Sequence, residues 1–290
     1  MIDNIKRFLS ALQSRGLEPA LLEVYGWLLL RFKLRLSRLN RLTSFGAELR
    51  SFYLSELLEK RFQGTVQYGP FKGLQLAGSL KWNPQSKASM LLGLYEKEIC
   101  DLLLKESCLG KKILVDLGAA DGFYAVGSLR ARLFEYAFCF ESSEKGRSAL
   151  QRNALINGVE KRMKVFGEAS VDWHLNLPKD QLKDMVIIFD IEGAEFELLT
   201  PSVLATLKES TLIVELHHEF VDRGGAKLEK LIDDAKEFFV PTFIRTTSRD
   251  ISQITEISSF SDIDRWLLCS EGRPRDAIWV LLKSRMFSRE

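Results

Sequence analysis

Acidic residues and a histidine follow four short apolar segments, and these side chains have the types and spacing to carry chemistry. They are Asp116, Glu141, Asp190, Glu192, Glu215 and His217, which come after the apolar segments 113–115, 135–140, 185–189 and 211–214. A carboxylate can hold an ammonium group or ribose hydroxyls, and an imidazole can accept a proton. If the segments are parallel strands, these residues meet at the sheet edge where open α/β sheets bind ligands.

A turn of small residues follows the first of these acids. The sequence GAADG, from Gly118 to Gly122, separates an apolar run from a periodic segment at 123–133, the strand–turn–helix order of a nucleotide-binding unit. A dinucleotide fingerprint needs a glycine where this chain has Ala120. Asp116 would repel a pyrophosphate and attract an ammonium. The residues therefore favour S-adenosylmethionine, which carries an ammonium and a sulfonium and no phosphate, over NAD or ATP.

The second and third segment ends predict the contacts to the rest of such a cofactor. Glu141 stands a little over twenty residues past Gly118, the spacing at which a carboxylate takes both ribose hydroxyls. The small polar turn after segment 163–166 is predicted to contact the edge of the adenine ring. The predicted cofactor-binding residues are Asp116, Gly118, Ala119, Gly122, Phe123, Glu141, Ser142, Glu168, Ala169 and Asp190.

The last two segment ends predict the catalytic residues, which are Asp190, Glu192, Glu215 and His217. Methyl transfer to a hydroxyl needs an aligned acceptor and a way to remove its proton. His217 has the intrinsic pKa of a general base. Alternatively, Asp190 and Glu215 with a histidine hold a divalent metal that lowers the pKa of the acceptor. A plainer interpretation is that Glu192 and Glu195 only open a helix, where acids favour the N-terminal dipole.

These side chains require a sheet with connecting helices. Apolar runs predict strands at 113–115, 135–140, 163–166, 185–189, 211–214, 240–244 and 277–282, and periodicity predicts helices at 90–105, 123–133 and 226–238. The order is typical of an α/β, Rossmann-like fold with a mostly parallel sheet. Residues 65–80 predict a β-hairpin or two short strands, and residues 251–262 predict a loop.

The composition excludes several classes of protein. A chain of 290 residues that is 46% hydrophobic can bury one sizeable α/β core plus an appendage. The net charge of +2 is too small to indicate a nucleic-acid partner. The four cysteines form no CxxC or zinc-site spacing, which favours a reducing cytoplasm. No signal peptide and no membrane-spanning stretch is evident, so we expect a soluble protein.

Four stretches together resemble the FkbM-type class I S-adenosylmethionine-dependent methyltransferases: VDLGAADGFY, FESSEKGRSALQRNALING, IIFDIEGAEFELL and LIVELHHE. The most specific is DIEGAE, from Asp190 to Glu195. The resemblance covers roughly residues 90–285. It implies O-methylation of a sugar, polysaccharide or natural-product hydroxyl, and an antiparallel last strand at the sheet end. It also implies that Glu96 can face the cofactor, although a solvated helix acid is the more common role. The chain departs from the family at Ala120, where asparagine is frequent.

We therefore expect three regions: a helical basic N-terminal extension (1–62), a small β/loop segment (63–89) and a methyltransferase catalytic domain (90–290). Residues 31–42 hold five basic residues and no acid. Such a helix can touch an anionic membrane surface, although a solvated helical cap is the plainer interpretation. We expect a small-molecule or glycan acceptor and no nucleic acid. The alternatives are a non-catalytic S-adenosylmethionine-binding or scaffold module, and an NAD-dependent enzyme that Ala120 and Asp116 argue against.

Overall fold

The computed structural model describes residues 21, 36–76, 86–252, 254–273 and 276–287. The chain forms two compact units, Met1–Arg50 and Ser51–Glu290, which divide within helix α3 (Leu36–Phe62). The predicted helical extension at residues 1–62 stays a prediction. The further division into residues 63–89 and 90–290 stays a prediction. Of the predicted basic segment, residues 31–35 lie outside the described residues, as do the side chains of Arg38 and Arg41.

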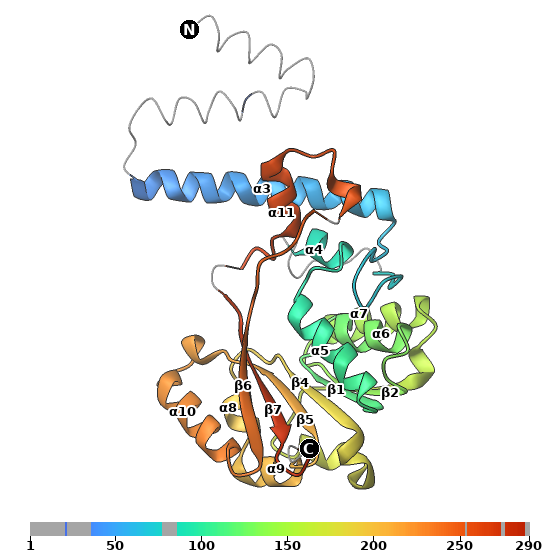
Figure 1. Cartoon of the computed structure of the whole chain (residues 1–290), viewed down its shortest axis with the longest axis vertical. Helices are drawn as coiled ribbons and strands as arrows, with labels where there is room; N and C mark the ends of the chain where they lie inside the picture. The colour runs from blue at the N-terminus through green and yellow to red at the C-terminus, as the bar shows by residue number, and fades with distance from the viewer. Residues whose placement is uncertain (1–20, 22–35, 77–85, 253, 274–275, 288–290) are drawn as a thin grey trace, which may run out of the picture. The chain divides into compact units, whose positions relative to one another are not determined.

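A seven-stranded sheet forms the centre of the second unit, in the order β3-β2-β1-β4-β5-β7-β6 (Figure 1). The strands are β1 (Ile113–Leu117), β2 (Tyr136–Phe140), β3 (Met163–Phe166), β4 (Met185–Phe189), β5 (Thr211–Glu215), β6 (Phe239–Arg245) and β7 (Ile278–Ser284). Strands β1 to β5 pair in parallel, and β7 pairs antiparallel with both β5 and β6. The predicted Rossmann-like, mostly parallel fold with an antiparallel last strand is confirmed.

The position of β7 differs from the expectation. The last strand does not lie at the end of the sheet, because it pairs with β5 through Val214 and Val280 and with β6 through Phe243 and Val280. Strand β6 therefore forms the edge. Pro241, which has no amide hydrogen to donate, is tolerated on this edge strand.

The apolar runs of the central strands are continuous because both faces of the sheet are covered. Leu114 of β1 belongs to one hydrophobic cluster, while its neighbours Ile113 and Val115 belong to another. The first cluster includes α5 (Lys97–Cys108), α6 (Phe123–Arg130) and α7 (Glu144–Ile156); the second includes α8 (Glu195–Leu198), α9 (Pro201–Thr206) and α10 (Gly224–Ala235). Figure 1 shows α5 and α6 beside β1 and β2, and α10 beside β6.

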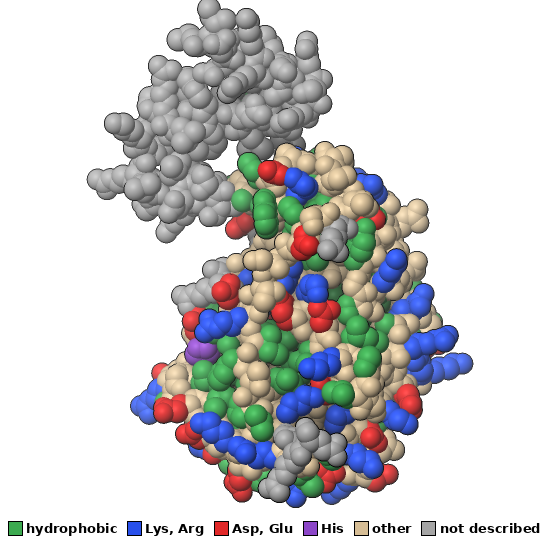
Figure 2. All heavy atoms as spheres, in the orientation of Figure 1, with side chains coloured by type: hydrophobic (Ala, Val, Ile, Leu, Met, Phe, Trp, Pro, Cys, Tyr) green, Lys and Arg blue, Asp and Glu red, His purple; other side chains and the backbone are tan. Residues whose placement is uncertain are grey.

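The remaining elements are short. They are α4 (Lys87–Leu91), α11 (Asp262–Cys269) and the 3₁₀ turns η1 (Glu160–Arg162), η2 (Trp173–Asn176), η3 (Lys179–Asp184), η4 (His218–Phe220) and η5 (Thr255–Ile257). The visible face in Figure 2 mixes acidic and basic side chains, as the net charge of +2 suggests, with basic ones gathered along the edge on the side of α6 and α7. Within the part of the chain that the structure describes, no helix combines the length and apolarity needed to cross a bilayer.

The single helix predicted at 90–105 is wrong, because two left-handed residues divide it. Helix α4 ends at Leu91 and α5 begins at Lys97, with Gly93 at φ +70° and Glu96 at φ +43° between them. A Cβ atom on Gly93 would overlap with the backbone carbonyl of Tyr68. The close approach of that loop therefore requires a glycine and ends the helix.

The predicted hairpin at 65–80 is also not formed within the described residues. Thr65 and Gln75 make an isolated antiparallel bridge, and the backbone between them folds into turns at Gly69 and Gly73. Phe71 from these turns instead packs against Gly127 of α6, where a side chain would clash with the ring. The predicted loop at 251–262 contains η5 and leads directly into α11.

Candidate active site

The strand order reverses between β1 and β4, which places the ends of these two strands at the crevice of the sheet. Gly118 follows β1, and its amide donates to Phe140 at 2.9 Å. Asp190 follows β4, and its amide donates to Leu117 at 3.0 Å. A Cβ atom on Gly118, at φ +86°, would overlap with the carbonyl oxygen of Asp190. The glycine is thus required by the approach of β4 as well as by the turn.

Ala120 adopts the left-handed conformation of a glycine, at φ +46°. For an L-residue this conformation is unfavourable by roughly 1–2 kcal/mol. The Ala120 amide donates to Glu141 Oε2 at 2.8 Å, and the Ser143 amide donates to Glu141 Oε1 at 2.7 Å. Gly146 makes room for this carboxylate, since a Cβ atom there would lie 2.8 Å from the Glu141 carboxyl carbon. Glu141 therefore ties the two turns after β1 and β2 together.

A pocket opens over the Gly118 turn. Its lining includes four predicted cofactor-binding residues, which are Gly118, Ala119, Phe123 and Asp190. The other lining residues are Ser86, Met90, Tyr95, Ala120, Asp121 and Tyr124. Both Tyr95 and Tyr124 stand edge-on to Phe123, with ring centroids 5.4 and 5.7 Å away. Among the described residues, the lining combines aromatic rings with two carboxyl groups and includes no lysine or arginine.

The other predicted cofactor-binding residues lie outside the pocket lining. They are Asp116, Gly122, Glu141, Ser142, Glu168 and Ala169. Asp116 is buried, and burial together with the Asp190 charge raises its pKa to about 7. Gly122 packs against α6 and α7, Ser142 is exposed, and Glu168 is exposed with Ala169 half-buried. The turn after β3 is therefore not brought to the pocket.

The four predicted catalytic residues come together beside the pocket, around the buried ring of His217. Its Nε2 atom lies 3.7 Å from Asp190 Oδ1, 3.6 Å from Glu192 Oε2 and 3.7 Å from Glu215 Oε2. These separations are longer than hydrogen bonds. The Nδ1 atom lies 3.5 Å from Glu195 Oε1. Asp190 also lines the pocket, so this cluster adjoins the place where a cofactor would sit.

Glu195 is more than a helix-opening acid. It begins α8, as the plainer interpretation proposes, but it is fully buried. Its carboxylate accepts from the backbone amides of Gly193 and His217, both at 2.8 Å. Glu192, at φ +53°, precedes the helix with an exposed side chain. Burial lowers the pKa of His217, but the Glu195 carboxylate beside its ring and the charges of Asp190 and Glu192 outweigh it and raise the pKa above the ordinary value.

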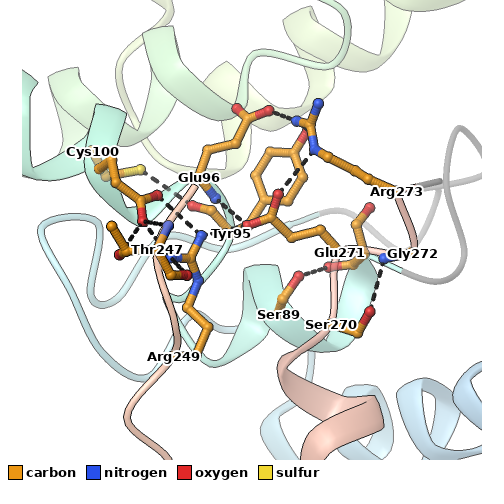
Figure 3. Close-up of polar contacts among 12 residues, drawn as sticks. Ser89, Tyr95, Glu96, Cys100, Thr247, Arg249, Ser270, Glu271, Gly272 and Arg273 are labelled. Carbon is orange, nitrogen blue, oxygen red and sulfur yellow. Dashed lines mark hydrogen bonds and ion pairs between the residues drawn. The ribbon is translucent and has the colours of Figure 1, made fainter. Parts of the chain in front are cut away.

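Arg273 reaches this cluster through Glu215, and Figure 3 shows it beside Glu96 and Glu271. It pairs with Glu215 at 2.8 Å, with Glu271 at 3.0 Å and with Glu96. The solvated role considered for Glu96 is wrong: the residue is buried and also accepts from the Tyr124 hydroxyl. Burial, followed by neighbouring acids, raises the pKa of both Glu96 and Glu215. The site therefore holds more carboxyl groups than cations.

A second arginine fixes the segments that carry Arg273. Arg249 is nearly buried and pairs with Glu98 of α5 and with Glu271, both at 2.6 Å (Figure 3). Glu98 also accepts from the amide and hydroxyl of Thr247. Residues 247–249 and 270–273 are thereby joined to the start of α5, which follows Glu96.

Two sets of side chains have the geometry of a metal site among the described residues: Asp190 with Glu192 and His217, and Glu96 with Asp190 and Glu215. In each set, one ligand atom per residue lies within 4.8 Å of the others. The predicted metal alternative named Asp190, Glu215 and a histidine. Asp190 is common to both sets, so one ion at this position would use it in either case.

Sequence reasoning missed Asp121 and Tyr124 as pocket residues and Arg273 as the counter-ion. Asp121 lies in the GAADG turn and Tyr124 directly follows Phe123, so the motif gave a signal for both. Arg273 had none. It lies in a polar stretch 58 residues from its partner Glu215, and only the fold brings the two together.

No protein-family model and no curated protein matches the chain. Solved structures match at low identity. An O-methyltransferase from Bacillus cereus in complex with SAH is 14% identical, covers 63% of this chain and 79% of its own, and has a TM-score of 0.42. Cofactor-bound Rv0187 from MTB is 12% identical, with 97% and 96% covered and a TM-score of 0.45.

An rRNA methylase from Streptococcus thermophilus is similar at 14% identity, with 65% of this chain and 95% of its own covered and a TM-score of 0.42. At such low identities and TM-scores these likenesses support no functional inference. The FkbM subtype finds no match among them. The strand order and the geometry of the crevice are therefore the basis for the function proposed next.

Proposed function

We propose that the protein is an S-adenosylmethionine-dependent O-methyltransferase. The observation that carries this proposal is an acid-lined, aromatic pocket at the β1–β4 crevice, which adjoins a histidine–carboxylate cluster. No lysine or arginine is among the described residues that line it. A pyrophosphate cofactor would be repelled there, whereas an ammonium and a sulfonium would be attracted. S-adenosylmethionine supplies a methyl group on a sulfonium, which reacts with an acceptor oxygen placed in line with it.

The pocket residues have distinct roles in this proposal. Asp190 and Asp121 provide negative charge toward the methionyl ammonium, and the Gly118 turn gives backbone access. The rings of Tyr95, Phe123 and Tyr124 are of the kind whose faces stabilise a sulfonium. Glu141 holds the turn in place through Ala120. Its spacing from Gly118 is the reason to propose that it binds the ribose hydroxyls. Asp116 is buried outside the pocket lining, and this proposal gives it no direct contact with the cofactor.

The acceptor proposed is a hydroxyl of a sugar, polysaccharide or natural product, as the FkbM-type resemblance implies. A neutral acceptor is supported because Arg273, the cation described beside this cluster, is already paired with carboxyl groups and offers no free positive charge to the phosphates of a nucleic acid. When the acceptor oxygen attacks the methyl carbon, the carbon–sulfur bond breaks toward sulfur and the hydroxyl proton must leave. His217 and the neighbouring carboxylates lie beside the pocket and can accept that proton.

We further propose that Asp190, Glu192 and His217 hold a divalent cation. Two ligands bound at about 2.1 Å to one ion lie roughly 3–3.5 Å apart, close to the 3.6 and 3.7 Å found here. A bound cation would lower the pKa of the acceptor hydroxyl. Glu195 beside Nδ1 would orient the imidazole, as carboxylates commonly do for histidine ligands. The alternative is that His217 itself is the general base.

Two experiments test these proposals. The first incubates the protein with methyl-labelled S-adenosylmethionine and a panel of sugars, polysaccharides and RNA; label on a neutral hydroxyl is expected, and label on RNA contradicts the acceptor proposal. The second measures Mn²⁺ binding by calorimetry. We expect binding in the wild type and at least tenfold weaker binding in His217→Ala. Equal binding in both leaves His217 as the base.

A non-catalytic module that binds S-adenosylmethionine is the second candidate function, and binding with no transfer to any acceptor would favour it. For localisation we propose the cytoplasm: none of the four cysteines forms a disulfide. Peripheral membrane contact through residues 31–42 is proposed on charge alone. Unchanged sedimentation with anionic liposomes after deletion of residues 1–50, the first compact unit, would contradict it.

A further inference from the structure

A second pocket lies at the far end of α6 from the cofactor pocket. Helix α6 begins at Phe123, which lines the cofactor pocket, and ends at Arg130, which lines the second pocket. Eight residues at 1.5 Å each place the two ends of the helix about 10 Å apart. The second pocket has a volume of about 600 Å³ and opens to solvent. Its lining shares no residue with that of the first.

Three arginines line this pocket, and none of the described lining residues is acidic. Arg130 ends α6, Arg132 lies in the following turn, and Arg162 precedes β3. None of the ion pairs found among the described residues involves any of the three, whereas Arg249 and Arg273 are both held by carboxylates. Three guanidinium groups therefore share one concavity without a counter-ion in the described part of the chain.

The wall of the pocket is fixed by hydrogen bonds. Asn157 accepts from the Gln75 amide at 3.0 Å and donates to the Gln75 carbonyl at 2.8 Å. Arg162 donates one Nη2 hydrogen to the Leu129 carbonyl at 2.7 Å, which anchors its guanidinium and leaves other donors available. These hydrogen bonds to backbone atoms hold Asn157 and Arg162 in place, while Arg130 and Arg132 are exposed to solvent.

Helix-dipole stabilisation explains only part of this arrangement. A cation at a helix C-terminus is favourable, and Arg130 and Arg132 stand at the end of α6. The dipole of α6 does not explain the position of Arg162, which precedes a strand. Positive charges gathered in one pocket repel each other, and a bound anion offsets this repulsion. Phosphoryl oxygens match the paired donors of guanidinium groups, and one phosphoryl group offers enough oxygens to engage more than one arginine.

We propose that this pocket binds a phosphoryl group of a small ligand, at a site separate from the cofactor pocket. Its place at the opposite end of α6 excludes the methyl donor and the reacting hydroxyl as occupants. Leu155 and Ile156 are 65% and 46% exposed at the rim, so they offer apolar contact to the rest of such a ligand.

The test is calorimetric titration of the full chain with inorganic pyrophosphate in 150 mM salt, which screens non-specific attraction to within about 8 Å. We expect one site with a Kd below about 1 mM, since a diphosphate can engage more than one arginine. The double variant Arg130→Gln, Arg132→Gln should bind at least tenfold more weakly. The control Arg245→Gln, an exposed arginine on β6, should bind as the wild type does.

Three outcomes would overturn the proposal. They are no heat with wild type, equal affinity in the double variant, or displacement of pyrophosphate by S-adenosylmethionine. If a short RNA oligonucleotide binds and pyrophosphate does not, the ligand of this pocket is a nucleic acid and not a small molecule. Circular dichroism of each variant shows whether the fold is intact, and Arg132→Gly, suited to the φ of +59° at this position, provides a second charge-removing variant.

Discussion

At the scale of single residues, Ala120 shows how a departure from a motif is accommodated. The residue keeps the backbone of a glycine, and Glu141 accepts from its amide at 2.8 Å. Replacement by glycine removes the left-handed strain, which exceeds the added freedom of the unfolded chain. We predict that Ala120→Gly raises the free energy of unfolding by roughly 0.5–1 kcal/mol, measured by urea denaturation.

The control for this prediction is Ala154→Gly, in the interior of α7, which should lower the free energy of unfolding by about 1 kcal/mol or more. If Ala120→Gly destabilises the protein as much as the control does, then the left-handed conformation is not a source of strain.

Gly118 provides the second prediction at this scale. Because a Cβ atom there would overlap with the Asp190 carbonyl, Gly118→Ala must move β4 away from the turn. We predict a loss of about 3 kcal/mol or more in unfolding free energy, measured by denaturation, and no detectable S-adenosylmethionine binding. Gly167→Ala is the matched control, since nothing lies within 4 Å of its Cβ position. A wild-type affinity in Gly118→Ala would refute the geometry of the crevice.

At the scale of elements, Glu98 joins α5 to residues 247–249. Burial raises the pKa of Glu98, but hydrogen bonds from Arg249 and Thr247 outweigh it and lower the pKa to about 2. A lowered pKa contributes stability that is fully present above the ordinary value of 4.5 and lost as the pH falls toward 2. We predict that the midpoint temperature of thermal unfolding falls less between pH 4.5 and pH 2 in Glu98→Gln than in the wild type.

The exposed Glu237, for which no partner is found among the described residues, gives the control Glu237→Gln. Its profile should follow that of the wild type. Identical profiles for wild type and Glu98→Gln would show that the ion pair with Arg249 does not link α5 to the later segment.

The elements themselves were readable from sequence where local pattern decides them. Apolar runs identified β1 to β5 within one or two residues. The runs of β1, β4 and β5 are continuous because these strands are buried on both faces and leave no polar alternation. The helix at 90–105 was misread, since its periodicity continues through Gly93 and Glu96 while the contact with Tyr68 breaks it. No local sequence pattern indicated that β7 lies between β5 and β6, because the order of strands depends on contacts between segments that are distant in the sequence.

At the scale of the whole molecule, the sheet explains which site residues could be found. Acids at strand ends were predicted to converge, and Asp190, Glu192, Glu215 and His217 do so, because parallel strands end at one edge. Glu168 and Ala169 follow the edge strand β3, too far along the sheet to line the pocket. Arg273 and Glu96 enter through loops, whose positions only the complete fold determines.

The central claim is that the acid-lined pocket binds a cationic nucleoside cofactor, and calorimetric titration with S-adenosylmethionine tests it most directly. We predict one site in the wild type, at least tenfold weaker binding in Asp190→Asn, and no change in Asp172→Asn, an exposed control. NAD should give no heat. Binding of NAD, or S-adenosylmethionine affinity equal in Asp190→Asn and wild type, would contradict the account.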